Sequence, residues 1–380
     1  MRILILASPW LGGSGTVGLE LAKELSNKHF VVFLSFDYPY RISYERNFVF
    51  FSIVPFTYSL FPYPLYHSSL ITHIVDLVQR YKIDIIHAHY SIVFGESAGY
   101  SKMMIRDILG KKVKFILTFH GTDLIGFNFE KIGETPFKSI NQFLIDTADK
   151  ITTASNFMKN LILQNYKVNP NKIKVIPNFV NTGIFKKERD FDEREYIIHC
   201  SNFRKVKRAE KVFKSFLMIK DKINPKTKLV FIGQGPDREK IEKEVREKNI
   251  SDKVIFKELK SPEDMSYFLN KSLVAVYPSL FENFSLSILE AMSCGVPVVA
   301  TKVGGIPEVL NNENGFLIKN IKKPEKEITK AILEIISNRK KWETLSKNAE
   351  KTAKNFSTDK IIKEYEDVYK EIRKNKTYIL

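Results

Sequence analysis

The chain alternates short strand patterns with helical patterns twice over, and this alternation is what most constrains its fold. Strands are predicted at 2–7, 31–36, 83–88, 114–118 and 150–153 in the first half, and at 196–200, 228–232, 253–256, 273–277 and 296–301 in the second. Strands that alternate with helices form parallel sheets, because the chain must cross a face of the sheet between two parallel strands. The sequence therefore predicts an α/β protein with two Rossmann-like domains.

The length of the chain and a break in its middle predict where these domains lie. A chain of 380 residues is long for a single core, and its 44% hydrophobic content can fill two. Between 176 and 192, Pro177, Asn181 and Gly183 stand among charges, which is typical of a linker. We expect an N-terminal domain at 1–185, a second domain at 186–355, and a C-terminal helix at 356–380 that packs back on the first.

Lysine and arginine outnumber aspartate and glutamate by 60 to 43, which gives a formal charge of +17. Such a surface attracts phosphates, nucleic acids or acidic lipid headgroups. Because the sequence has no recognition-helix signature, RNP-type aromatic motif or zinc knuckle, nucleic acid is not an expected partner. Peripheral association with an anionic membrane stays open. The aromatic segment 48–66 would suit a lipid interface, although core packing is the preferred interpretation.

Targeting and metal signals are lacking in the sequence. No stretch reaches the roughly 18 uninterrupted apolar residues of a membrane span, and no cleavable signal pattern precedes the first strand. We expect a cytoplasmic protein, with the inner membrane face as an alternative location. The cysteines, Cys200 and Cys294, lie in apolar contexts without CxxC spacing, so buried reduced thiols are expected and a metal site is not.

The stretch from 280 to 309 carries the strongest functional signal. It places Glu282 and Glu290 at the two ends of a turn that joins a predicted strand to a helix at 286–292, and Gly304 and Gly305 form a second tight loop after the next strand. Free amides at a helix start favour an anionic ligand, and carboxylates accept hydrogen bonds from sugar hydroxyls. This combination indicates a sugar nucleotide. The alternative is that both carboxylates are solvated surface charges.

A basic loop follows the first strand of the second half, with the sequence SNFRKVKR at 201–208. Cations at a strand-to-helix junction can neutralise a pyrophosphate, and we favour Arg204 and Lys207 for this role over Lys205 and Arg208. Ordinary helix-surface charge is the alternative. Gly233, in IGQGPD after the next strand, repeats the pattern of a ligand-facing turn.

The first loop allows two interpretations. Gly13, Gly15 and Gly18 fit GxGxxG after a strand, and Asp37 follows the next strand at the distance of a ribose-binding acid, as in an NAD-dependent oxidoreductase. That interpretation leaves the region after Glu282 unexplained. A phosphate-facing loop, with the Gly13 amide and Ser14 near the reacting centre, accommodates both.

Histidines follow two predicted strands of the first half. The strand IDIIHAHY contains His87 and His89, and His120 opens the turn HGTD after FILTF. Alternation points the first two rings to one face of the sheet, but no third ligand has metal-site spacing, and one ring is expected to be core. His120 is the stronger site candidate, because Gly121 lets a ligand approach and Asp123 could orient a neighbour.

Taken together, ENFSLSILEA, GQGP, GGIPE, HGTD and the GGSG loop resemble glycosyltransferase family 4, retaining enzymes of the GT-B fold, over nearly the whole chain. This resemblance implies two Rossmann-like domains that face a central cleft. Within the family, YPLY, IDIIHAHY and SNFRKVKR are similar to members of the bacillithiol pathway that join N-acetylglucosamine from UDP-GlcNAc to L-malate. Ser285 and the loops 91–96 and 124–132 depart from the family pattern beside the expected acceptor pocket. A lipid-linked or polysaccharide acceptor at a membrane therefore stays open.

The resemblance also implies roles for individual residues. Donor-binding residues would be Gly13, Arg204, Lys207, Gly233, Glu282, Asn283, Phe284, Ser285, Leu286 and Glu290. The catalytic residues would be His120, Glu282, Arg204 and Lys207, and the acceptor would meet Ser14, Tyr90, Thr122 and Asn178. The leaving phosphate is expected to help deprotonate the acceptor on the same face, so no metal or other cofactor is implied. The expected partners are a nucleotide sugar and a small-molecule acceptor, with a homodimer as an open alternative.

Overall fold

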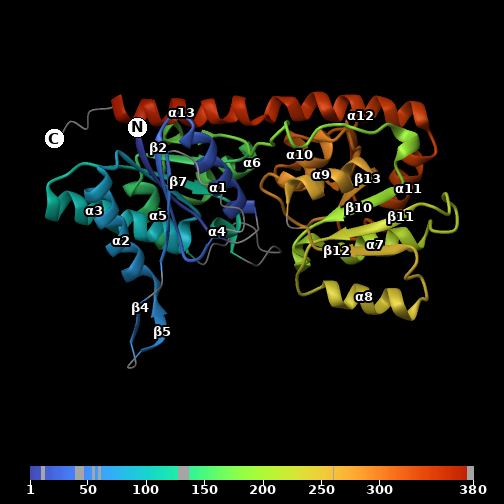
Figure 1. Cartoon of the computed structure of the whole chain (residues 1–380), viewed down its shortest axis with the longest axis horizontal. Coiled ribbons are helices and arrows are strands. Elements are labelled where there is room, and N and C mark those ends of the chain that lie inside the picture. The colour runs from blue at the N-terminus through green and yellow to red at the C-terminus, as the bar shows by residue number, and fades with distance from the viewer. Residues whose placement is uncertain are drawn as a thin grey trace. The chain divides into compact units, whose positions relative to one another are not determined.

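The computed structural model describes residues 1–9, 13–38, 47–53, 56–58, 61–126, 137–259 and 261–374. The chain divides into two compact units, Met1–Pro177 with Asp359–Leu380, and Asn178–Thr358. Each unit contains a parallel sheet with helices around it (Figure 1). The prediction of two Rossmann-like domains is confirmed.

The sheet of the first unit has seven strands in the order β3-β2-β1-β6-β7-β8-β9. Their bounds are β1 Arg2–Leu6, β2 Phe30–Ser35, β3 Phe48–Ser52, β6 Ile85–His89, β7 Lys114–Phe119, β8 Lys150–Thr153 and β9 Ile173–Val175. The five predicted strands of this half are confirmed, and β3 and β9 are additional. Since β3 pairs with β2, the start of the aromatic segment 48–66 is a sheet strand. A hairpin of β4 (Phe56–Tyr58) and β5 (Phe61–Leu65) follows, and residues 54–55 and 59–60 of the segment lie outside the described residues.

The helices of the first unit include a contribution from the end of the chain. They are α1 Gly13–Ser26, α2 Tyr66–Tyr81, α3 Glu96–Leu109, α4 Thr122–Ile125, α5 Lys138–Thr147, α6 Asn156–Asn165 and α13 Thr358–Lys374. The buried Tyr369 of α13 places its hydroxyl 2.7 Å from Nδ1 of His87, and Glu371 pairs with Lys150 at 2.8 Å. These contacts explain why the last helix belongs to the first unit.

The second unit repeats the architecture with six parallel strands in the order β12-β11-β10-β13-β14-β15. The strands are β10 Tyr196–Cys200, β11 Lys228–Ile232, β12 Val254–Lys257, β13 Ser272–Tyr277, β14 Val298–Thr301 and β15 Gly315–Ile318. The helices are α7 Ala209–Leu217, α8 Arg238–Glu247, α9 Pro262–Asn270, α10 Leu286–Ser293, α11 Glu325–Ile336 and α12 Arg339–Ala353. Their core includes Phe203, Phe231 and Trp342, each at most 1% exposed. All five strands predicted here are present, and β15 was not predicted.

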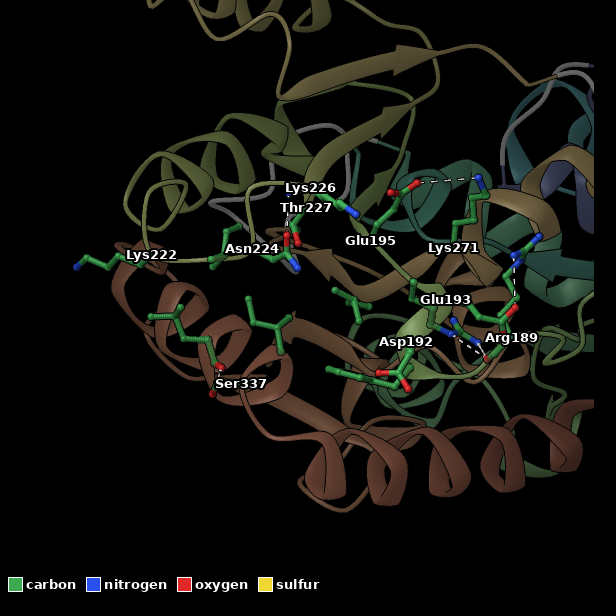
Figure 2. A pocket seen from close by; sticks show the side chains of 16 residues that line it. Arg189, Asp192, Glu193, Glu195, Lys222, Asn224, Lys226, Thr227, Lys271 and Ser337 are labelled. Carbon is green, nitrogen blue, oxygen red and sulfur yellow. Dashed lines mark hydrogen bonds and ion pairs between the residues drawn. The ribbon is translucent and has the colours of Figure 1, made fainter.

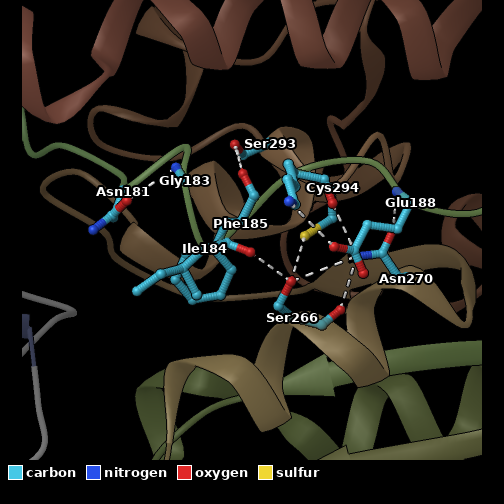
Figure 3. A network of polar contacts seen from close by, with 10 residues as sticks. Asn181, Gly183, Ile184, Phe185, Glu188, Ser266, Asn270, Ser293 and Cys294 are labelled. Atoms are coloured by element: carbon cyan, nitrogen blue, oxygen red, sulfur yellow. Dashed lines mark hydrogen bonds and ion pairs between the residues drawn. The ribbon is translucent and has the colours of Figure 1, made fainter.

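The division between the units precedes the predicted boundary at residue 185, because the intervening segment bonds to the second unit (Figure 3). Ser266 donates to the carbonyl of Ile184 at 2.9 Å, and Ser293 donates to that of Phe185. The Asn178 amide donates to the carbonyl of Phe284 at 2.7 Å. The supposed linker is thus part of the second unit from residue 178 onward.

Within the described ranges, no helix combines the length and the apolar character that crossing a membrane would require.

Candidate functional site

The loops that carry the predicted donor residues pack against one another through their backbones at the carboxyl edge of the second unit's sheet. Gly233 has a φ of 122°, and a Cβ there would lie 2.0 Å from the carbonyl oxygen of Ser201. Gly304 has a φ of 53°, and a Cβ there would lie 1.8 Å from the carbonyl oxygen of Glu282. Only glycine tolerates both the left-handed backbone and the close approach, so these residues hold the loops after β10 and β13 in place.

Glu282 and Lys207, predicted from separate motifs, meet in this loop cluster. Nζ of Lys207 lies 2.5 Å from Oε1 of Glu282, and the hydroxyl of Ser279 donates to the same oxygen at 2.9 Å. The backbone N–H of Gly305 donates to the Glu282 carbonyl at 3.0 Å. Glu282 is only 8% exposed. The structure therefore presents a carboxylate and an ammonium group, held together at the edge of the sheet.

The other cations of the basic loop divide into two kinds. Arg208 is buried, and its guanidinium donates to the backbone carbonyls of Ile321 and Lys322, so it braces the fold. Arg204 and Lys205 are exposed, and the Arg204 side chain has no hydrogen bond or ion pair among the described residues. The preference for Lys207 and Arg204 over Arg208 agrees with this geometry, whereas contact with a diphosphate stays a prediction.

The turn from β13 into α10 contains the remaining donor candidates. Asn283, Phe284 and Ser285 are buried, and Glu290 lies half-buried in α10. Burial, together with the neighbouring Cys200 and the negative charges of Glu290 and Glu282, raises the pKa of the Tyr277 phenol well above its usual value.

In the first unit, the HGTD turn is held by its own aspartate. The buried Asp123 carboxylate accepts hydrogen bonds from the backbone N–H groups of Gly121 at 2.7 Å, Ser91 at 3.1 Å and His120 at 3.1 Å. Burial raises the pKa of Asp123 to about 6, and these amides act against that rise. Asp123 thus joins the turn after β7 to the loop after β6.

Tyr90 and Thr122, two predicted acceptor residues, are brought together by this arrangement. The Tyr90 hydroxyl and Oγ1 of Thr122 share a hydrogen bond at 2.8 Å. Tyr90 has a φ of 85° and Val93 a φ of 67°, both in the left-handed region that such side chains rarely adopt. Strain of this kind clusters at functional sites. This backbone strain cannot be predicted from the sequence, because neither tyrosine nor valine favours the left-handed conformation.

The candidates at the start of α1 are less constrained. Gly13 is exposed, and a Cβ there would meet no atom within 4 Å, while Ser14 is half-buried. Gly18 is the glycine that packing requires, since its Cβ would lie 2.5 Å from Cβ of Ala7. Gly12 lies outside the described residues, as do residues 127–132 of the loop after HGTD.

The histidines form a buried chain that sequence analysis did not foresee. Nε2 of His87 lies 2.7 Å from Oγ1 of Thr118, the His87 and His89 ring centroids are 4.4 Å apart, and Nδ1 of His89 lies 3.1 Å from Nε2 of His120. Burial lowers the pKa of His87 and of His120 to about 3, and it lowers the pKa of His89 well below its usual value. All three rings are therefore neutral at pH 7. In the described part of the chain, no three metal-ligating side chains gather as an ion would require.

The sequence matches two family profiles, "Glycosyltransferase Family 4" over residues 11–183 and "Glycosyl transferases group 1" over residues 181–352. The chain is also 33% identical to the N-acetyl-alpha-D-glucosaminyl L-malate synthase of Bacillus anthracis, an alignment that covers 98% of this chain and 97% of that enzyme. The chain belongs to glycosyltransferase family 4.

Solved structures agree on the fold of this family 4 glycosyltransferase. A sucrose-phosphate synthase from Thermosynechococcus elongatus superposes with a TM-score of 0.81 at 18% identity, over 98% of this chain and 99% of that one. The Anabaena protein HepE, in complex with UDP-glucose, superposes with a TM-score of 0.77 at 16% identity, over 98% of this chain and 100% of that one. Family membership also decides between the two interpretations of the first glycine loop, in favour of the transferase and against the oxidoreductase.

A cavity of about 710 Å³ lies at the amino edge of the second unit's sheet (Figure 2). This edge is opposite the carboxyl edge, where the loops with the predicted donor residues lie. Its walls include Glu195, Thr227 and Lys271, each directly before a strand. Arg194 also lines it, but the guanidinium is occupied by backbone carbonyls, including those of Arg189 and Cys294. None of the predicted site residues borders this cavity.

Acid is expected to destabilise the first unit, because its buried histidines bind protons only when it unfolds. Their folded pKa lies below the unfolded value near 6.5, so the stability they contribute is present above that pH and lost as the pH falls. From about pH 7.5 to about pH 5.5, each histidine removes about 1 kcal/mol of stability and protonation of Asp123 offsets part of this loss, so the net loss is about 2–3 kcal/mol.

Hydrogen exchange read by mass spectrometry across a urea series would measure this loss for each unit separately. The second unit is the internal control, since burial lowers the pKa of its His199 to about 4 and the expected loss from that one histidine is about 1 kcal/mol. Equal stability of the first unit at the two pH values would contradict the prediction.

Proposed function

We propose that this family 4 enzyme is a retaining, metal-independent transferase that moves N-acetylglucosamine from UDP-GlcNAc to the hydroxyl of L-malate. The observation that carries the donor half of this proposal is the contact between Lys207 and Glu282, because it places a cation for a diphosphate beside a carboxylate for sugar hydroxyls. The choice of N-acetylglucosamine and malate rests on the similarity to the Bacillus anthracis enzyme over nearly the whole chain.

In the proposed reaction, the second unit binds the donor. Lys207 and Arg204 neutralise the charge that grows on the departing diphosphate. Because the Arg204 side chain is exposed, it can change its conformation to contact the diphosphate. Glu282 accepts hydrogen bonds from the sugar hydroxyls and Glu290 from those of the ribose. The N–H groups at the start of α10 and the Gly13 amide assist the phosphates.

The first unit supplies groups to the acceptor and the reacting sugar. The paired hydroxyls of Tyr90 and Thr122, together with Ser14, are suited to a small hydroxy-dicarboxylate. Asn178, the first residue of the second unit, can contribute its carbonyl oxygen and one amide N–H, since its other amide N–H donates to the carbonyl of Phe284. The leaving phosphate takes the proton of the acceptor hydroxyl. The acceptor oxygen then bonds to the anomeric carbon on the same face from which the phosphate departs, so the anomeric configuration is kept.

The test is UDP release from UDP-GlcNAc with L-malate, with succinate and without an acceptor, measured in the presence of EDTA. We expect release that requires L-malate, fails with succinate because it lacks the hydroxyl, and gives an α-linked product by NMR. Donor binding without malate-dependent release would overturn the acceptor assignment. Lipid-linked and polysaccharide acceptors would then be assayed on the same preparation. Dependence on an added divalent cation would overturn metal independence.

A further inference from the structure

His89 is fully buried and contacts the predicted catalytic histidine without being assigned a role itself. Its Nδ1 lies 3.1 Å from Nε2 of His120, while its Nε2 is buried and has no hydrogen-bond partner among the described residues. A Cβ on Gly18 would lie 3.4 Å from Cγ and 3.6 Å from Cδ2 of His89, so α1 packs closely on this ring.

The neutral state of both rings leaves two arrangements of the protons between them, since a neutral imidazole has one N–H and one acceptor nitrogen. If His120 donates from Nε2, the proton of His89 stands on Nε2, where it is a buried N–H without an acceptor. If His89 donates from Nδ1, its Nε2 is an unpaired acceptor instead. An orphaned buried N–H is among the rarest features of native proteins, so the second arrangement is favoured.

The other neighbours of His89 hold it in place. The His87 ring lies against it, tilted by 36°, and is itself fixed at both ring nitrogens, by the Tyr369 hydroxyl and by Oγ1 of Thr118. Thr118 in turn shares a hydrogen bond with Thr152 on the next strand. The position of Nδ1 of His89 is therefore set by three strands and by α13.

We propose that His89 is a positioning residue for sugar transfer: its Nδ1–H donates to Nε2 of His120 and thereby holds His120 in the tautomer that carries its proton on Nδ1. This deepens the function proposed above and rests on it for the role of His120. His120 then offers a neutral hydrogen-bond donor at a fixed position. Such a donor can stabilise an oxygen of the sugar donor as charge develops, without releasing a proton.

The first test is ¹⁵N–¹H NMR of the histidine side chains in the wild-type protein without substrates. We expect both His89 and His120 to show the pattern of a neutral ring protonated on Nδ1. A His120 protonated on Nε2 would overturn the proposal, whatever the substrates prove to be. Because no substrate is present, this outcome is separate from failure of the malate reaction.

The second test compares two substitutions of His89. Asparagine can place an N–H donor where Nδ1 stands, whereas leucine has a similar volume and no donor. We expect His89→Leu to lower kcat by about 30-fold with KM for UDP-GlcNAc changed less than about threefold, and to mix the His120 tautomers, because the lost interaction matters mainly in the transition state. His89→Asn is expected to retain the tautomer and kcat within about threefold. Equal kcat in the two variants would contradict the proposal.

Discussion

Replacing Lys207 by methionine is expected to lower kcat/KM for sugar transfer by about 10²- to 10³-fold, the usual effect of removing one group that stabilises transition-state charge. The Lys207 ammonium is held by Glu282 at 2.5 Å, so it is positioned before the donor arrives. Methionine keeps an unbranched apolar stem of nearly the same length and removes the ammonium group, with its charge and its hydrogen-bond donors. Steady-state UDP release would measure the effect.

The same substitution leaves the Glu282 carboxylate, 8% exposed, without its cation, and breaking such a pair by removing one partner typically costs about 3–5 kcal/mol. The double variant Lys207→Met with Glu282→Gln should therefore regain most of the stability of the second unit while remaining inactive. Lys205→Met, an exposed lysine two residues away, is the matched control and should keep activity within about twofold. Wild-type turnover by Lys207→Met would rule out its assignment to the diphosphate.

In the two large sheets, sequence analysis found every central strand and one edge strand, β12, and it missed the other three edge strands. The central strands were readable because burial on both faces makes them continuous apolar runs. The missed strands β3, β9 and β15 all lie at sheet edges. An edge strand is paired on one side only, and β9, with three residues, is too short to show a period. The division after residue 177, rather than near 185, has a related cause, since the Asn178 amide and the carbonyls of Ile184 and Phe185 bond to a surface that the sequence does not reveal.

Motifs predicted which residues of the candidate site matter, but not how they are held. Lys207 and Glu282 are 75 residues apart, and only the parallel order of β10 and β13 brings their loops together. The histidine chain and the left-handed Tyr90 depend on contacts between β6 and β7 and with α13. Such contacts leave no local pattern, because the residue types involved are equally common in an ordinary core.

Asp123→Asn is expected to lower the stability of the first unit by about 2–3 kcal/mol and the rate of transfer by at least about tenfold. The carboxylate accepts backbone N–H groups from two loops, at His120 and Gly121 on one side and at Ser91 on the other. Asparagine has the same shape, but one of its two terminal atoms is an NH₂ group that cannot accept. In either orientation of the asparagine amide, its NH₂ group faces a backbone N–H of one of the two loops.

The consequence is separation of the two loops, and with it displacement of His120 and of the Tyr90–Thr122 pair. Urea unfolding and UDP release, measured on the same preparation, test the two parts of this expectation. Asp107→Asn is the matched control: that carboxylate is exposed and, among the described residues, is paired only with the adjacent Arg106, so unaltered stability and unaltered turnover are expected. If Asp123→Asn matched the wild type in both stability and turnover, the turn in the wild type would have to be held by an Asp123 carboxyl group that is already protonated. The geometry argues against that, because all three of its partners are donors.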